Sequence, residues 1–292
     1  MKRTTTTPYL FLSPAIVLFT AFIVVPIGYT AYLSFRQVKV EGLGLGADAR
    51  HEVFAGWRNF RDALSDPEFS GSLLRVLGYG AVVVPVMLGL ALLFALLLDT
   101  PSARMRRFAR VSIFLPFAVP ALIGGMLWGF LYLPSVSPFP LGDLDLLGGN
   151  VLLFSVANVA VWGGTGFNMM VLYTALRAVP PEIYESARID GCTELRLALR
   201  IKIPMLTPAL VMTGFFSIIA TIQVFAEPMI LKPLTNSIPS TWTPLMKIYR
   251  DAFVIGDHYS AAATSLVLAL ATLLLSFTFL RLFGRRAFGG ER

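Results

Sequence analysis

The chain contains six apolar runs, each long enough to cross a lipid bilayer as a helix. A helix that spans about 30 Å of hydrocarbon needs about 20 mostly apolar residues. In lipid, the backbone groups must also be hydrogen-bonded within the spanning structure, which a helix achieves. The runs therefore predict an all-α, polytopic membrane protein with six transmembrane helices, at about 9–35, 73–98, 111–133, 151–176, 205–231 and 261–283.

The composition excludes an ordinary soluble domain. Of the 292 residues, 56% are hydrophobic and only 14% are charged, and the mean hydropathy is +0.72. Soluble domains carry about 25% charged residues. The longest connection, 36–72, predicts one short amphipathic helix from Trp57 to Leu64. We therefore expect a single transmembrane domain over 1–292.

The chain has few residues that could bind a metal or form a disulfide. Cys192 is the single cysteine, which rules out an intrachain disulfide. The two histidines, His51 and His258, lie outside the apolar runs, and the runs hold no cluster of His or carboxylates. No metal site is predicted.

Lys and Arg set the predicted orientation, because cytoplasmic loops of membrane proteins are enriched in them. With the N-terminus inside, 15 of the 24 Lys and Arg residues are cytoplasmic. This places both termini and the polar segment 177–204 in the cytoplasm. The net charge of +7 is explained by these loops, so nucleic acid is not expected as a partner. The first run far exceeds the apolar core of a signal peptide, which favours a retained span.

The segment from Tyr184 to Pro208, YESARIDGCTELRLALRIKIPMLTP, is polar and basic between two apolar runs. Pro180 and Pro181 favour a helix start, and Glu182 and Glu185 suit the positive end of that helix. Gly191 allows the left-handed conformation that ends a helix. The pattern predicts two short helices with a break at Asp190–Gly191. The basic residues of the second helix fit contact with a partner or with lipid headgroups, and both remain open for Arg196, Arg200 and Lys202.

This segment resembles the "EAA" coupling loop of the membrane subunits of ATP-binding-cassette (ABC) importers. The matching residues are Glu185, Ala187, Asp190, Gly191, Ile201 and Pro204, whereas Ser186, Cys192, Ala198 and Ile203 depart from the commonest residues. FLPFAVPALIGGMLWGFLY, GFNMMVLYTALRAVPPEIYESARIDG and QVFAEPMIL resemble successive parts of the carbohydrate-uptake branch, of the maltose- and glycerol-phosphate-permease type. The loop after the fifth run, LKPLTNSIPSTW, lacks the Gly-Gly-Pro that this branch often has.

The resemblance implies a type I ABC importer permease in the cytoplasmic membrane of a prokaryote, without catalytic activity of its own. It implies that Glu185, Ala187, Asp190 and Gly191 contact the ATPase, with Ala187 small enough to let the helix sit in a groove. The implied partners are a second, homologous permease subunit in a heterodimer, two ATPase subunits, an extracytoplasmic binding protein, a sugar-like solute and membrane lipids. The chain has no Walker motif, so ATP and Mg²⁺ are expected on the ATPase subunits.

Polar residues within the apolar runs indicate a solute path, because such residues usually face a cavity or another helix. They are Trp162, Thr165 and Asn168 in the fourth run and Gln223 and Glu227 in the fifth. By position, the resemblance implies substrate contacts at Trp162, Gly163, Gly164, Phe167 and Gln223. For Trp162, helix packing is the alternative, as it is for Gly163, Gly164 and Gly166. For Glu227, a solvated position near the outer end is the alternative.

Two other function classes remain as alternatives. An ion-coupled secondary transporter would show inverted repeats and buried ion sites, and neither is visible in the sequence. A lipid-modifying membrane enzyme is the second alternative, because Asp190–Gly191 resembles the start of the alcohol phosphotransferase signature. The sequence DGCTELR lacks the later paired aspartates of that signature.

Overall fold

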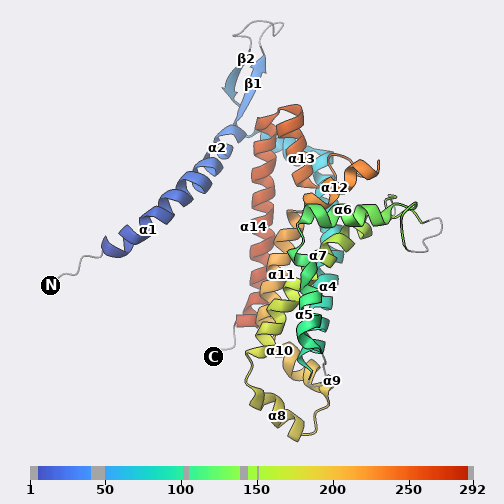
Figure 1. Cartoon of the computed structure of the whole chain (residues 1–292). Coiled ribbons are helices and arrows are strands. Elements are labelled where there is room, and N and C mark those ends of the chain that lie inside the picture. Colours follow the sequence, from blue (N-terminus) through green and yellow to red (C-terminus); the bar gives the residue numbers. More distant parts are fainter. Residues whose placement is uncertain (1–5, 41–49, 101–104, 139–143, 150, 289–292) are drawn as a thin grey trace, which may run out of the picture. The chain divides into compact units, whose positions relative to one another are not determined.

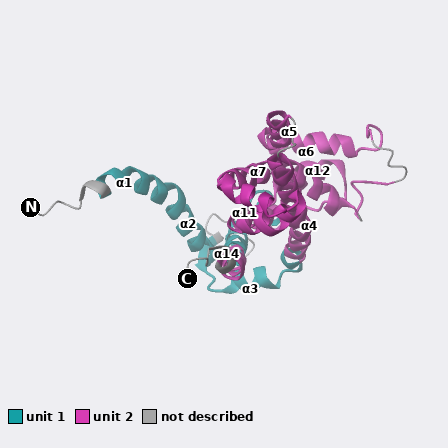
Figure 2. Cartoon of the chain, turned by 90° about the horizontal axis from the view of Figure 1, so that it is seen from below, with its two compact units in different colours: residues 1–70, 247–271 teal, residues 71–246, 272–292 magenta. Residues whose placement is uncertain are grey.

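The computed structural model describes residues 6–40, 50–100, 105–138, 144–149 and 151–288. The chain divides into two compact units (Figures 1 and 2). Unit 1 consists of residues 1–70 and 247–271, and unit 2 of residues 71–246 and 272–292. Residues 1–5 and 289–292 lie outside the described residues, so the predicted cytoplasmic position of both termini stays a prediction.

Five described helical segments are long and apolar enough to cross a membrane. They are Tyr9–Ser34, Pro67–Asp99, Leu152–Arg177, Thr207–Leu234 and His258–Gly284. The first comprises α1 (Thr6–Phe19), the π-helical turn η1 (Thr20–Val24) and α2 (Val25–Ser34); the others are α4 (Pro67–Asp99), α7 (Leu152–Arg177), α11 (Thr207–Ile222) with α12 (Ala226–Leu231) and η4 (Lys232–Leu234), and α14 (His258–Phe288). The prediction of a multi-pass helical protein is confirmed.

The predicted span at 111–133 is two helices rather than one. α5 (Arg106–Ala118) and α6 (Ala121–Tyr132) are bent by 96° at a break that contains Val119 and Pro120. Proline lacks a backbone N–H and drives the residue before it into an extended conformation, and Val119 has ψ of 127°. The apolar run predicted the extent of this helical segment but not the bend within it. The count of six spans remains a prediction.

A second break interrupts the predicted span at 205–231. α11 ends at Ile222, and α12 begins at Ala226. The backbone of Gln223 to Phe225 between them is not helical. Both breaks leave short stretches of irregular backbone within otherwise apolar segments, which a membrane protein tolerates only where that backbone is covered by protein or lines a cavity.

Unit 1 contains a β-hairpin that the sequence did not predict. Strands β1 (Arg36–Val40) and β2 (Arg50–Phe54) pair antiparallel with Arg36 opposite Phe54 and Val38 opposite Glu52. The predicted amphipathic helix is confirmed as α3 (Arg58–Ser65). Its buried Asn59 donates to the carbonyls of Ser34 and Arg36 at 2.9 and 2.7 Å, which fixes α3 beside the hairpin.

A cluster of ion pairs in unit 1 lies where α13 (Pro244–Tyr249) leads into the π-helical turn η5 (Arg250–Ile255). The ammonium of Lys247 lies 2.9 Å from Asp66 and 2.5 Å from Asp251. Burial lowers the pKa of Lys247, but the hydrogen bonds to the two carboxylates outweigh it and leave that pKa raised.

Unit 2 holds two hydrophobic clusters along α4 and α7. The first includes Val76, Tyr79, Val156 and Trp242, and the second includes Ala91, Met169, Leu172 and Leu176. Glycines let α7 approach its neighbours: a Cβ at Gly164 would lie 2.5 Å from Met87 Sδ in α4, and one at Gly166 would overlap the backbone of α5 at Ile113. These contacts hold α4, α5 and α7 together and so position both candidate sites described next.

Candidate functional site

The polar segment between α7 and α11 forms a hinged pair of short helices, as predicted. α8 (Pro181–Ile189) is followed by α9 (Glu194–Leu197), the π-helical turn η3 (Ala198–Lys202) and α10 (Ile203–Met205). In Figure 1, α8 and α9 lie at one end of unit 2, beyond the end of α7. We call residues 177–204 the coupling loop, after the loop that this segment resembles in sequence; its role in coupling stays a prediction.

The hinge is a glycine C-cap. Gly191 has φ of +79°, a left-handed conformation that side chains with a Cβ adopt at a cost. Its N–H donates to the carbonyl of Arg188, and the N–H of Cys192 donates to the carbonyl of Ala187, both at 3.0 Å. This pair of bonds is the Schellman motif, which satisfies carbonyls that the helix end would leave unpaired.

The second helix starts on a capping residue and is tied back to the first. The hydroxyl of Thr193 accepts from the backbone N–H of Arg196 at 3.4 Å. Arg188 Nε donates to Glu194 Oε1 at 2.9 Å, a bond that joins α8 to α9 across the hinge. That hydrogen bond is the main cause of the raised pKa of Arg188. The pair is partly exposed, so it sets geometry more than stability.

A buried ion pair anchors the coupling loop to the membrane helices. Lys202 Nζ lies 2.6 Å from Asp99 Oδ2, and neither side chain is more than 4% exposed. Asp99 is the last residue of α4, and the Lys202 ammonium also lies 5.1 Å from the centre of the Tyr184 ring in α8. Burial, with the nearby charge of Asp99, raises the pKa of Tyr184. Lys202 is therefore an internal anchor, and neither sequence alternative for it, headgroup or partner contact, is correct.

The outward face of the coupling loop combines carboxylates with apolar side chains. Glu182, Glu185 and Asp190 are exposed. Ile189 is 85% exposed and Leu195 is 70% exposed. Ala187 is only 6% exposed, so its small side chain packs within this chain. Contact between Ala187 and a partner stays a prediction.

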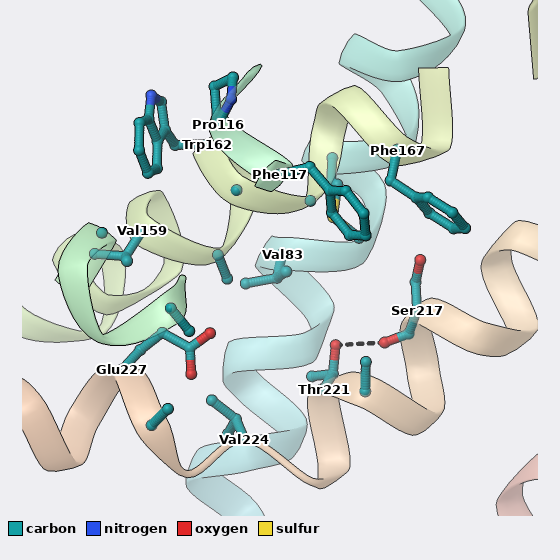
Figure 3. Close-up of a pocket in the computed structure, with 18 of the residues that line it drawn as sticks. Val83, Pro116, Phe117, Val159, Trp162, Phe167, Ser217, Thr221, Val224 and Glu227 are labelled. Atoms are coloured by element: carbon teal, nitrogen blue, oxygen red, sulfur yellow. Dashed lines mark hydrogen bonds between the residues drawn. The ribbon is translucent and has the colours of Figure 1, made fainter. Parts of the chain in front are cut away.

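A cavity of about 750 Å³ lies in unit 2, between the two helix breaks (Figure 3). Its walls come from α4, α7 and α11, from Pro116 to Pro120 at the first break, and from Gln223 to Phe225 at the second. All five residues that the sequence proposed for the solute path line it: Trp162, Gly163, Gly164, Phe167 and Gln223.

Aromatic rings cover several walls of the cavity. Phe117 and Phe167 are stacked with their ring centres 4.9 Å apart, and Figure 3 shows them side by side. Trp162 meets Trp128 edge to face at 6.0 Å. Its ring also covers Gly124, where a Cβ would lie 3.1 Å from Trp162 Cζ3. Trp162 thus serves both helix packing and the cavity wall, which the sequence had left as alternatives.

The polar atoms of the cavity are few and mostly neutral. Thr221 donates to the carbonyl of Ser217 at 2.7 Å, and Asn168 donates to the carbonyl of Gly164 at 3.0 Å. Gln223 is exposed at the end of α11. Glu227, one of the polar residues that indicated a solute path, is half-buried and lines the cavity. The break before α12 changes the path of the chain just before Glu227.

The three glycines of α7 differ in role. A Cβ at Gly163 would meet nothing within 4 Å, so this wall of the cavity is open. Gly164 lines the cavity but also packs tightly on Met87, and Gly166 packs on α5 and does not line the cavity. Thr165 donates to the carbonyl of Val161 and is likewise absent from the lining. The face of α7 that lines the cavity is therefore narrower than the sequence predicted.

The comparisons with known proteins identify the family. The family described as "Binding-protein-dependent transport system inner membrane component" matches residues 81–288. The sn-glycerol-3-phosphate transport system permease protein UgpA of Agrobacterium fabrum is 30% identical over 280 residues, which cover 92% of each chain. The chain belongs to this family. The UgpA protein of Shigella flexneri is 26% identical over 92% of this chain and 91% of that protein.

Solved structures show the same fold. A chain of a bacterial ABC transporter involved in the import of the acidic polysaccharide alginate superposes with a TM-score of 0.77 at 19% identity, over 95% of this chain and 94% of that chain. The MetNI methionine ABC transporter has a more distant chain, with a TM-score of 0.57 over 75% of this one. The fold is that of a type I ABC importer permease, as predicted.

Family membership decides between the function classes. The chain is a multi-pass inner-membrane component of an ABC importer, and a transport component rather than an enzyme. The secondary transporter and the lipid-modifying enzyme have no comparable support. The residues of the two sites that sequence reasoning missed include Asp99 in the loop anchor and Phe117 and Met87 in the cavity wall. Only the prolines at 116 and 120 gave a sequence signal, because they predict a break beside Phe117.

Proposed function

We propose that this chain provides half of the membrane path of an ABC importer for a sugar or sugar-like solute, and that its coupling loop transmits the closure of an ATPase to that path. The observation that carries the proposal is the presence of both devices in one unit. A cavity lined by aromatic rings and by neutral amide and hydroxyl groups lies along α7 and α11. A hinged loop with an exposed surface connects the same two helices.

The cavity suits a solute with both apolar ring faces and hydroxyl groups. Aromatic faces such as Trp162 and Phe167 pack against the C–H faces of a sugar ring, and Gln223 donates to or accepts from hydroxyls. Gly163 leaves room at the wall between them. The relatives are named for sn-glycerol-3-phosphate and for the acidic polysaccharide alginate. These names support a solute that carries hydroxyl groups, without identifying which one.

The coupling loop suits a protein surface with complementary charge and an apolar groove. Ile189 and Leu195 offer exposed apolar side chains, and Glu185 and Asp190 offer carboxylates beside them. The buried Lys202–Asp99 pair makes the loop move with α4, and the hinge at Gly191 sets the angle of α8. Docking of two ATPase subunits, which bind ATP and Mg²⁺, would thereby reach the helices that line the cavity.

The full assembly that follows contains this chain, a second homologous permease subunit as its heterodimer partner, two ATPase subunits and an extracytoplasmic binding protein. One related transporter was solved with a periplasmic protein that holds an alginate pentasaccharide. In this proposal, both termini and the coupling loop are cytoplasmic. Cysteine labelling from outside should reach 236–245 and miss 185–195, and the reverse pattern would contradict this orientation.

Vesicles with the complete assembly test the proposed function. Binding protein and a panel of labelled sugars and polyols are added outside, and ATP is enclosed or omitted. We expect uptake that requires ATP and that stops when the ATPase subunits are left out. Uptake that follows an imposed proton or sodium gradient without ATP would overturn the proposal and favour a secondary transporter.

A further inference from the structure

The cavity carries one carboxylate and, among the described residues that line it, no Lys, Arg or His. The carboxylate belongs to Glu227, in the first turn of α12. It is half-buried, and within the described part of the chain no hydrogen bond or ion pair engages it. Figure 3 shows its side chain among the lining residues, with Val159 and Val224 on neighbouring walls.

We propose that Glu227 makes this half of the path selective against anions, so that the solute is a neutral polyhydroxyl compound without a phosphate or carboxylate group. The inference rests on the proposed function and narrows its substrate class. A carboxylate without a partner accepts hydrogen bonds from hydroxyl groups. It also repels an anion that enters the same cleft, where low-dielectric walls focus its field.

The relatives make the inference specific. They are named for sn-glycerol-3-phosphate and for the acidic polysaccharide alginate, and both solutes are anions. Anions are usually held by cationic side chains, above all arginine, whose fork matches phosphate and carboxylate oxygens. The described lining has no Lys or Arg; beside its aromatic rings it offers the neutral amides of Asn168 and Gln223 and the Glu227 carboxylate. The solute names of these relatives therefore do not transfer to this chain.

The charge of the cavity can be measured without knowing the solute. Cys192 is the only native cysteine, so Cys192→Ala with Gly163→Cys leaves one thiol, at an open point of the cavity wall. In the complete transporter, this thiol is treated with a neutral hydroxyethyl and an anionic sulfonatoethyl methanethiosulfonate. Labelling of this chain is followed by mass spectrometry, and each rate is divided by the rate for free 2-mercaptoethanol.

We expect the neutral reagent to react about tenfold faster than the anionic one after this correction. Adding Glu227→Gln keeps the shape and removes the charge, and should narrow the ratio to about threefold or less. Glu227→Asp should keep most of the preference. Asp62→Asn is the matched control, because Asp62 is an exposed acid of α3 that does not line the cavity, and it should leave the ratio unchanged.

An unchanged ratio in Glu227→Gln, or a native cavity that already favours the anionic reagent, would overturn the inference. The second result would mean that the partner subunit supplies cations to the shared path. The measurement needs no transport, so its failure is separate from failure of the proposed function. A complex that takes up sugars with ATP but shows no charge preference would refute only the role of Glu227.

Discussion

The coupling loop and the cavity lie in the same unit but are stabilised in opposite ways. The loop is polar, and its position depends on a few directional contacts: the Lys202–Asp99 pair, the Gly191 cap and the Arg188–Glu194 bond. The cavity is bounded by packed apolar and aromatic side chains. Asn168 and Thr221 in its lining bond to helix carbonyls, whereas Gln223 is exposed. The loop can therefore transmit a movement through rigid contacts. Exposed polar groups of the cavity, such as Gln223, are available to bind a solute.

The largest expected effect concerns the loop anchor. Asp99→Ala leaves the buried charge of Lys202 unpaired, which costs about 3–5 kcal/mol of stability. Lys202→Ala should cost less, because Arg177 lies 4.0 Å from Asp99 and still faces its carboxylate. Thermal unfolding of the purified complex should show this loss. The double variant Asp99→Leu with Lys202→Met removes both charges and should be less destabilised than either single variant. If the single variants match the wild type, Asp99 and Lys202 do not fix the loop.

The packing of α7 gives the next comparison. Gly166→Ala places a methyl group against the backbone of α5, which cannot rotate away as a side chain can, and should cost about 1–3 kcal/mol. Gly163→Ala is the matched control, since its methyl meets nothing, and its stability should be unchanged or up to about 1 kcal/mol higher. Equal losses at both positions would show that the cavity wall at Gly163 is closed.

Trp162 tests the cavity as a binding site. Trp162→Ala removes about 1–3 kcal/mol of apolar contact and should weaken the apparent affinity for solute about ten- to a hundredfold. Trp162→Phe keeps a ring and should lose less. Gln223→Ala should weaken uptake in the same sense, and the effects should be non-additive if both residues contact one solute. Loss of assembly in Trp162→Ala would return this residue to helix packing with Gly124 and Trp128.

The smallest expected effect concerns the hinge. Gly191→Ala forces a Cβ into a left-handed conformation, at a cost of about 1–2 kcal/mol. Gly191→Asn should lose less, because asparagine tolerates this conformation. The expected result for Gly191→Ala is a modest fall in thermal stability and a larger fall in solute moved per ATP. A normal transport ratio would show that the angle of α8 does not matter for coupling.

Local features of this protein were predictable, and distant contacts were not. The apolar runs gave the spanning helices, and Pro181 and Gly191 gave the start and end of α8. Lys202 and Asp99 are 103 residues apart, so no spacing rule could pair them. The β1–β2 hairpin depends on strand pairing rather than on a strong local pattern. The bend between α5 and α6 is hidden in a continuous apolar run, although Pro120 marks its position.

The path residues show the same limit within one helix. Trp162, Gly163, Gly164 and Phe167, which the family resemblance proposed for the solute path, line the cavity. Their contact with a solute stays a prediction. The separate role of Gly166 was not visible, since only the position of α5 decides which glycine is packed. For Glu227 the sequence left both the solute path and a solvated outer position open, because the break at Gln223–Phe225 could not be located within the apolar run.

In the proposed transporter, the coupling loop links ATP hydrolysis to transport, and the cavity binds the solute. The most direct test measures ATP hydrolysis and uptake in the same vesicles for two variants: Glu185→Ala with Asp190→Ala in the loop, and Trp162→Ala in the cavity. We predict that the loop variant loses uptake together with the stimulation of ATP hydrolysis by loaded binding protein. The cavity variant should keep that stimulation and lose uptake at low solute concentration. Normal uptake in the loop variant, or the same loss of stimulation in both, would contradict the account.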